Sequence, residues 1–237
     1  MTCLSYDAEG NQKTWRYSKK EYKAKIGVVG AQRRRRMWRR KAGLEEDMLF
    51  LPSGKTGDIK SFHFHVEQLF RVLDRVLELN FKRRVREMRF TQYGKKQKVM
   101  HDICERVIRG GGFENDRRNV TIAYGNATFT TKGSLPGPVK AVRRELQRRG
   151  EDIHLVNEDY TSMLCSSCHE RLEPMFDEEG RAIHAVRRCH NSECNRMVWH
   201  RDVNACLNIM CVFIYELLYG FRPPVFTRAF QQQQHVF

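Results

Sequence analysis

Four cysteines towards the C-terminal end constrain the fold of this chain more than any other feature. They form two short pairs, Cys165-x2-Cys168 and Cys189-x4-Cys194, which 20 residues separate. Each pair has the spacing of a tight turn that presents two thiolates to one ion, and four thiolates close the tetrahedral shell of Zn²⁺. Thiolate ligands also suit a borderline-soft metal. The sequence therefore predicts a zinc ribbon in which the metal is structural.

Reduced structural cysteines, a disulfide pair or an iron–sulfur cluster would use the same four residues. The sequence shows no secretory leader, so we expect a reducing compartment, which disfavours disulfides. Zinc is the preferred interpretation. The other four cysteines lack such spacing and are expected to be core or incidental thiols: Cys3, Cys104, Cys206 and Cys211.

The chain is strongly basic. Lysine and arginine number 43 against 28 acidic residues, which gives a formal net charge of +15 at pH 7. Each phosphate that a cationic side chain neutralises releases bound counterions, so this charge favours a polyanionic partner. There is no lipidation signal or basic amphipathic anchor, and the apolar stretch 209–218 is short and includes Glu216, which argues against a membrane. We therefore expect the partner to be nucleic acid.

Arginine is concentrated in a predicted helix near the start of the chain. Residues 1–17 have the pattern of a β-hairpin, and Ser18 with Glu21 matches a capping box that begins a helix. That helix carries the basic runs 33–36 and 39–41. The runs could bind a phosphate backbone or act as a nuclear import signal, and a solvated helix face is the alternative. The following loop, 52–57, lacks the full phosphate-loop motif.

Apolar residues at steps of three and four predict an amphipathic helix from about Ser61 to Phe81. A second helix is expected after Tyr93 and Gly94, ending at the glycines 110–112. Phe90 and Tyr93 are interleaved with basic residues at the junction between these helices, and two interpretations apply. They could be stacking platforms along a stripe that follows a nucleic-acid backbone, but aromatic residues at such positions are more often core. The basic residues are Lys82, Arg83, Arg84, Arg86, Arg89, Lys95, Lys96 and Lys98.

The next segment predicts a βαβ unit and hence an α/β fold. Val120–Tyr124 is a short apolar strand, Pro136-Gly137-Pro138 opens a helix, and Ile153–Val156 is a second strand of the type buried in a mostly parallel sheet. After the cysteines, a helix from Val203 to about Tyr219 is expected to pack on the sheet. Its expected packing face is Val203, Cys206, Met210, Phe213 and Leu217.

Two acidic residues flank the cysteine region. Glu158 follows the second strand by two residues, and Asp202 begins the last helix. If the cysteine region is an insertion between that strand and that helix, its closed ends bring the two carboxylates close together. Hard carboxylate oxygens at such ends suit Mg²⁺ and phosphodiester hydrolysis. The alternative is a surface acid at Glu158 and a helix-terminal acid at Asp202 that the helix dipole favours.

Two segments carry a resemblance to a known family. Residues 157–168, NEDYTSMLCSSC, and residues 200–209, HRDVNACLNI, resemble the C-terminal half of transposon-encoded TnpB proteins, and most of all their eukaryotic and viral relatives, the Fanzor proteins. These relatives are RNA-guided DNA endonucleases. The resemblance implies an RNase H-like (RuvC-type) mixed sheet with a helical insertion and an inserted zinc ribbon. It also implies structural Zn²⁺, catalytic Mg²⁺, and DNA and guide RNA as partners.

This resemblance divides the chain into four expected parts. Residues 1–160 would be a partial RuvC-like domain with a helical insertion at about 18–112. Residues 161–199 would be the zinc ribbon, residues 200–219 the final RuvC-like helix, and residues 220–237 a loose tail.

The resemblance assigns the acids and shows one departure. Asp202 matches the acid of the family's Arg-Asp-x-Asn-Ala motif, and Glu158 matches the glutamate that Fanzor proteins carry before Thr-Ser-x-x-Cys. TnpB proteins instead place this acid at the position of Gly125. The family's first catalytic aspartate should precede the hairpin 1–17, and Asp7, in the hairpin turn, is a poor substitute.

We therefore expect a truncated, impaired nuclease. The alternative is a non-enzymatic zinc-ribbon protein that binds DNA or RNA. We also expect nuclear localisation, because the glutamate is placed as in the eukaryotic relatives and the arginine run resembles an import signal.

Overall fold

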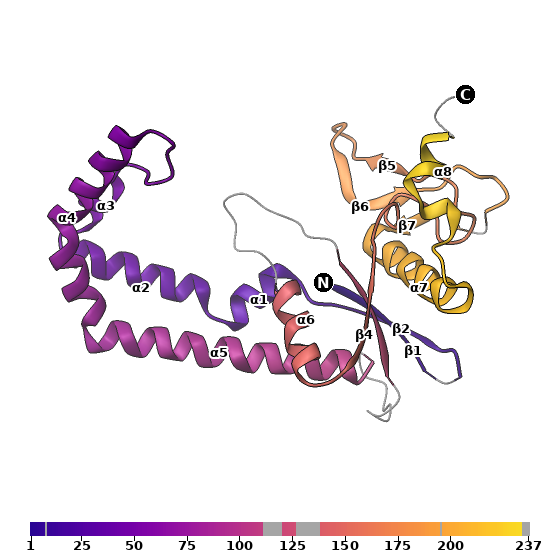
Figure 1. The fold of residues 1–237 in the computed structure, drawn as a ribbon, viewed down its shortest axis with the longest axis horizontal. Helices are drawn as coiled ribbons and strands as arrows, with labels where there is room; N and C mark the ends of the chain where they lie inside the picture. The colour runs from indigo at the N-terminus through magenta and orange to yellow at the C-terminus, as the bar shows by residue number, and fades with distance from the viewer. Residues whose placement is uncertain (8, 111–119, 127–137, 195, 234–237) are drawn as a thin grey trace. The chain divides into compact units, whose positions relative to one another are not determined.

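A computed structural model describes residues 1–7, 9–110, 120–126, 138–194 and 196–233 (Figure 1). The chain forms two compact units. The first combines Met1–Lys19 with Met100–Phe237, and the second is Lys20–Val99.

The first unit begins with the predicted β-hairpin. Strand β1 (Thr2–Tyr6) pairs antiparallel with β2 (Gln12–Arg16), so that Thr2 lies opposite Arg16. The Asp7 carboxylate accepts a hydrogen bond from the Asn11 backbone at 2.7 Å and holds the turn. This turn chemistry is what the sequence indicated, because aspartate, glycine and asparagine favour turns.

The predicted βαβ unit is confirmed. Strands β3 (Thr121–Gly125) and β4 (Asp152–Val156) are parallel, with Gly125 opposite Val156. Helix α6 (Val139–Arg148) connects them and buries Val142 and Leu146. Pro136 and Gly137, which were expected to open this helix, lie outside the described residues.

The sheet differs from the expected single mixed sheet. The described strands form three small sheets, β1-β2, β3-β4 and β5-β6-β7. Strand β4 is also less buried than predicted, since Leu155 is 48% exposed. Helix α7 (Arg201–Tyr219) packs on β1, β3 and β4. It covers the side of β4 that carries His154 and Val156, and Leu155 faces the other side because side chains alternate along a strand.

The cysteine region is an antiparallel ribbon, as predicted. Strands β5 (Glu173–Phe176), β6 (Ala182–Arg188) and β7 (Val198–His200) lie in the order β5-β6-β7. The last strand leads directly into α7, so the ribbon is an insertion between β4 and α7.

The packing face of α7 differs from the expected one. Its fully buried residues are Asn204, Asn208 and Val212, whereas Leu217, which was expected to pack on the sheet, is exposed. By length and composition α7 is the one helix of the described residues that would suffice to cross a membrane. We assign it to the core of the first unit, because it contacts strands of all three small sheets and buries two asparagines.

The segment after α7 is folded, although a loose tail was expected. A short 3₁₀ helix, η2 (Pro224–Phe226), precedes α8 (Arg228–Gln233). Phe226 is fully buried against Val156, Leu164 and Val212. A large aromatic side chain stabilises a fold by burial wherever it reaches the core, and Arg222 adds hydrogen bonds to the Asn157 and Asp159 carbonyls, so the segment is anchored to the first unit.

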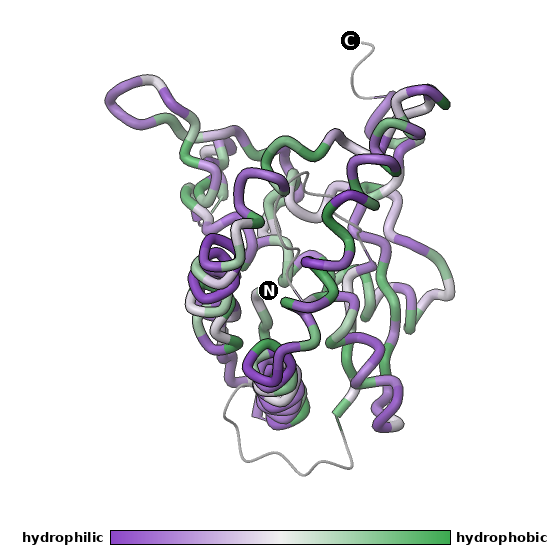
Figure 2. Tube along the Cα trace, turned by 90° about the vertical axis from the view of Figure 1, so that its left-hand side faces the viewer, coloured by the Kyte–Doolittle hydropathy of each residue, from purple (hydrophilic) through white to green (hydrophobic). Residues whose placement is uncertain are grey.

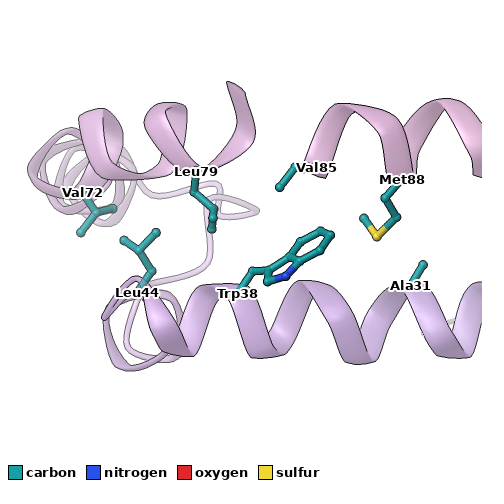
Figure 3. Close-up of a cluster of buried hydrophobic side chains, with 7 residues drawn as sticks. All are labelled: Ala31, Trp38, Leu44, Val72, Leu79, Val85 and Met88. Atoms are coloured by element: carbon teal, nitrogen blue, oxygen red, sulfur yellow. The ribbon is translucent and has the colours of Figure 1, made fainter. Parts of the chain in front are cut away.

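The second unit is helical. Its elements are α1 (Lys19–Lys25), α2 (Val28–Lys41), α3 (Glu45–Leu49), α4 (Ile59–Phe81) and the first part of α5 (Arg83–Ile108). The elements α2, α4 and α5 each contribute to one hydrophobic cluster, which Figure 3 shows around the Trp38 ring. Hydrophilic and hydrophobic segments alternate along the helices (Figure 2), as amphipathic helices require. The cluster is Ala31, Trp38, Leu44, Val72, Leu79, Val85 and Met88.

Two helix boundaries differ from the prediction. The expected single helix after Ser18 is interrupted at Gly27, whose φ of 71° is left-handed and separates α1 from α2. Conversely, α5 begins at Arg83 and continues through Gly94. An exposed glycine inside a helix costs about 1 kcal/mol, which the burial of Val85 and Met88 before it and Val99 after it outweighs.

Candidate metal centre and acidic cleft

The four predicted cysteines converge on one point. Their sulfur atoms all lie within 4.8 Å of one another. The Cys165 and Cys194 sulfurs are 3.7 Å apart, and the Cys168 and Cys189 sulfurs are 3.5 Å apart. A tetrahedral zinc with Zn–S bonds of about 2.3 Å requires sulfur atoms roughly 3.8 Å apart. The four thiols are therefore close enough together to share one zinc ion.

Each cysteine pair lies in its own turn of the ribbon. Cys165 and Cys168 lie in the turn before β5, where the Cys165 N–H donates to the Glu170 carbonyl at 2.8 Å. Cys189 and Cys194 lie between β6 and β7, and the Cys189 N–H donates to the Met197 carbonyl at 2.8 Å. The two turns are what the 2- and 4-residue spacings predicted, and they form the two halves of a closed site.

Groups around Cys165 favour its thiolate form. Burial raises the pKa of this thiol, but hydrogen bonds from the backbone N–H groups of Ser167 and Cys168, together with those from the Cys194 and Cys168 thiols, lower the pKa to about 7. The Trp199 indole N–H also donates to the Cys165 sulfur, at 3.2 Å. A thiolate held by several donors is the form that binds metal. These four residues could hold a structural zinc.

Glu158 lies directly over Gly125. If Gly125 carried a side chain, its Cβ would lie 2.5 Å from the Glu158 Cδ and 2.9 Å from its Cγ, and it would overlap the carboxylate oxygen. The parallel pairing of Gly125 with Val156 explains this closeness, because Glu158 follows Val156 by two residues as the chain turns at the strand end. The Glu158 carboxyl group thus occupies the side-chain position at the end of β3.

Asp202 lies in the first turn of α7 and is 43% exposed. Its carboxylate contacts two residues of the hairpin: Arg16 at 3.4 Å and the Thr2 hydroxyl at 3.5 Å. The His200 ring caps the helix by accepting a hydrogen bond from the Asp202 N–H at 3.3 Å. The helix therefore begins as predicted, but the side-chain cap is His200 and not Asp202.

Both acids line one cavity of about 1490 Å³ in the first unit. Every residue of β1 and of β3 also lines it, so it lies between the two strands that no described strand joins. The Cys206 thiol is close enough to both carboxylates to respond to their charge. Burial, and then the negative charges of Asp202 and Glu158, raise the pKa of this thiol to about 12. The sequence expectation that the two carboxylates would share one cleft agrees with this arrangement, while their role stays a prediction.

Two asparagines that the sequence reasoning missed connect this cleft to the metal centre. Asn204 and Asn208 are fully buried, one turn apart on α7. Each side-chain amide donates to both the Thr161 and the Leu164 carbonyls, at 3.3 and 2.7 Å from Asn204 and at 2.7 and 2.8 Å from Asn208. Each carbonyl oxygen thus uses both lone pairs, and each amide both protons.

This asparagine clamp holds the segment that leads from Glu158 to the first cysteine turn. Asn204 also accepts a hydrogen bond from the Ser166 N–H at 2.9 Å, next to Cys165. At the other end, the Thr161 hydroxyl donates to the Glu158 carbonyl at 2.9 Å. The signal in the sequence was two asparagines four residues apart in an otherwise apolar helix, since buried polar groups are almost always hydrogen-bonded.

The positive charge is concentrated in the second unit. Residues 20–99 contain 22 of the 43 lysines and arginines but nine of the 28 acidic residues. The first unit, which carries the cysteine ribbon, is nearly neutral by comparison. A polyanion would therefore be attracted mainly to the helical unit.

Part of the chain matches the model of a known domain family. Residues 139–209 match the family model described as Cas12f1-like, TNB domain. This segment is similar to a TNB domain. The match covers α6, β4, the ribbon with all four cysteines, and α7 as far as Ile209, which is just under a third of the chain. No curated protein matches the chain. The match supports the resemblance to TnpB- and Cas12f-like proteins and indicates nucleic-acid binding.

The contact between Glu158 and Gly125 has a direct test. We expect Gly125→Ala to move the Glu158 carboxylate out of the cleft and to lower the affinity for Mn²⁺ at least tenfold, because the new Cβ takes its place. Stability should fall by less than about 2 kcal/mol, since a flexible side chain relieves the overlap. Titration of Mn²⁺ by electron paramagnetic resonance measures the change. In a Glu158→Ala background, Gly125→Ala should have no further effect on Mn²⁺ affinity. A second tenfold loss of affinity there would contradict the contact between Glu158 and Gly125.

Proposed function

We propose that this chain is the RuvC-like nuclease portion of an RNA-guided, Mg²⁺-dependent DNA endonuclease of the TnpB and Fanzor type. One observation carries the proposal: Glu158 and Asp202 come from different elements, yet both line one cleft at the root of a TNB-like ribbon. Two carboxylates in one cleft are what a divalent ion needs to activate water and stabilise a leaving oxygen.

In this proposal each part of the chain has a distinct role. Glu158 and Asp202 would hold Mg²⁺, which supplies the Lewis acid and the activated water for strand cleavage. The four cysteines would hold Zn²⁺, and the asparagine clamp would fix Glu158 and Asp202 relative to that metal. The helical unit would follow the guide–target duplex by its shape and phosphates.

Activity of the chain as it stands would be weak. A divalent ion in a nuclease site is generally held by more than two carboxylates or by substrate phosphates as well. Within the described residues the unjoined edges of β1 and β3 face the cleft that contains both acids. We propose that full activity requires a further strand with a third carboxylate between these edges.

Metal binding and cleavage by charge-neutral variants test the proposal. Glu158→Gln and Asp202→Asn keep the shape of each side chain but remove a hard anionic ligand. We expect either change to weaken Mn²⁺ binding at least tenfold and to abolish Mg²⁺-dependent cleavage of single-stranded DNA. Glu178→Gln, an exposed acid in the turn after β5, serves as the matched control and should change neither. Mn²⁺ binding that all three variants retain equally would contradict a metal site in the cleft.

A second candidate function is non-enzymatic binding of DNA or RNA. The observation that favours it is Arg16, whose guanidinium lies 3.4 Å from the Asp202 carboxylate and 3.1 Å from the His200 ring. A cationic side chain in this place neutralises Asp202 as a metal would. The test is to measure nucleic-acid binding and Mn²⁺ binding in the wild-type chain and in Arg16→Ala. If both proteins bind nucleic acid and neither binds Mn²⁺, this second function is established over the first.

A further inference from the structure

One face of α5 presents aromatic rings to solvent. Phe90 is 77% and Tyr93 61% exposed, so the expectation that these rings belong to a core is wrong for the residues that the structure describes. The packed face of this part of α5 contains Val85, Met88 and Val99. Exposed aromatic rings one turn apart are costly unless a partner covers them, because each ring leaves a large apolar area in water.

Basic side chains share this face. A helix turns about 100° per residue, so Arg86, Arg89, Phe90, Tyr93 and Lys96 fall within roughly a third of its circumference. All five side chains are exposed. We call this set the α5 outer face. It places a cation about one turn before Phe90 and another about one turn after Tyr93.

Acidic residues are scarce around the α5 outer face. Residues 82–98 contain eight lysines and arginines and one acid, Glu87. Glu87 is in an ion pair with Arg83, 2.7 Å from its Nε, so its charge is balanced within the helix. Arg89 donates to the Asn80 side chain at 2.6 Å, which orients its guanidinium without neutralising it. The face therefore keeps a positive potential around its rings.

Helix α4 provides the contrast. Phe70 is 67% exposed, a value close to those of the α5 rings. Its neighbours one turn away include Glu67 and Asp74, which would repel phosphate. Exposure of an aromatic ring is therefore not by itself specific to α5, but Phe70 has acidic neighbours one turn away where the α5 rings have cationic ones.

We propose that the α5 outer face binds single-stranded nucleic acid, with bases stacked on Phe90 and Tyr93 and phosphates bound by Arg86, Arg89 and Lys96. Stacking requires the flat face of a base, which a duplex keeps inside its own stack, so the rings select a single strand. The cations alone would bind both forms. The proposal rests on the proposed nucleic-acid-binding function and adds the form of nucleic acid and the residues that select it.

Fluorescence anisotropy with labelled 12-nucleotide oligomers, single-stranded and duplex, tests this in the full chain. We expect Phe90→Ala and Tyr93→Ala each to weaken single-strand binding by about tenfold, with duplex binding changed less than twofold. Arg86→Gln together with Lys96→Gln should weaken both forms and reduce the salt dependence of each. Phe70→Ala is the matched control and should change neither.

Each outcome separates this inference from the broader proposal. Equal losses for the two oligomers in Phe90→Ala, or the same loss in Phe70→Ala, would overturn the stacking role while nucleic-acid binding stands. Failure of the wild-type chain to bind either oligomer would overturn both. Unchanged oligomer binding with altered self-association of Phe90→Ala and Tyr93→Ala in sedimentation experiments would assign the α5 outer face to a protein partner and overturn the proposal.

Discussion

Replacing Asn204 and Asn208 together with leucine is expected to unfold the first unit. Either asparagine alone supplies one donor to each of the Thr161 and Leu164 carbonyls, and the double change leaves both buried carbonyls without any side-chain donor. A buried polar group without a partner costs about 1–3 kcal/mol. The double change therefore removes an estimated 5 kcal/mol or more, which approaches the whole stability of an ordinary domain.

The single variants should differ in a defined order. Asn204→Leu also leaves the Ser166 N–H without its acceptor, so we expect a loss of about 2–4 kcal/mol. Asn208→Leu should cost about 1–2 kcal/mol, because the Asn208 side-chain oxygen is buried without a partner among the described residues and its removal relieves that cost. The two losses should not add, since the carbonyls keep one donor until the second asparagine is gone.

Chemical denaturation followed by circular dichroism measures these losses. Leu218→Ala, on the exposed end of α7, is the matched control and should change stability by less than about 0.5 kcal/mol. Equal small losses for Asn204→Leu, Asn208→Leu and Leu218→Ala would show that the clamp is not a source of stability. A double variant as stable as the sum of its singles would argue against the shared carbonyls.

The parts of the structure that the sequence predicted are those that local spacing encodes. The two cysteine pairs, the hairpin around Asp7 and each single strand of the βαβ unit depend on residues close together in the chain. The ribbon could be predicted from 30 residues, 165–194, because two short spacings and one ion leave few arrangements. The position of Asp202 at the start of α7 follows from the end of that ribbon.

The parts that sequence could not predict depend on partners distant in the chain. Nothing near Gly125 indicates that Glu158, 33 positions later, fills its side-chain space. Gly94 resembles a helix end, and the burial of Val85 and Met88 on α2 and α4 overrides it. Phe226 follows a pair of prolines and resembles part of a loose tail, yet it is fully buried. In each case packing, which sequence patterns report poorly, outweighs local preference.

Removing zinc is expected to unfold the cysteine ribbon of the first unit. The core of the ribbon consists of Cys165, Cys189 and Cys194 with Leu172 and Trp199, so three of its five buried residues are candidate zinc ligands. Without the ion these thiols supply little apolar burial, and zinc contributes on the order of 10 kcal/mol to comparable small sites. We expect a chelator to unfold β5, β6 and β7 and to release the start of α7 that carries Asp202.

Separate tryptophans make the test selective. Trp199 donates to the Cys165 sulfur, and its fluorescence should shift to the red when zinc is removed. Trp38 lies in the hydrophobic cluster of the second unit. In a variant that carries both Trp15→Phe and Trp199→Phe, Trp38 is the one tryptophan left, and its emission should not respond. Cys165→Ser should lose the bound zinc, whereas Cys211→Ser, outside the cluster, should retain one zinc per chain by atomic absorption.

Asp202→Ala distinguishes a structural metal from a catalytic acid. Asp202 is solvent-exposed in part and its contact with Arg16 is a surface ion pair, so its removal should change stability by less than about 1 kcal/mol and leave zinc in place. The chelated wild type and Asp202→Ala should therefore both lose Mn²⁺ binding, but only the chelated protein should lose the ribbon. Unfolding of similar extent in both would mean that Asp202 supports the fold, and the division of roles between the cysteines and the acids would be wrong.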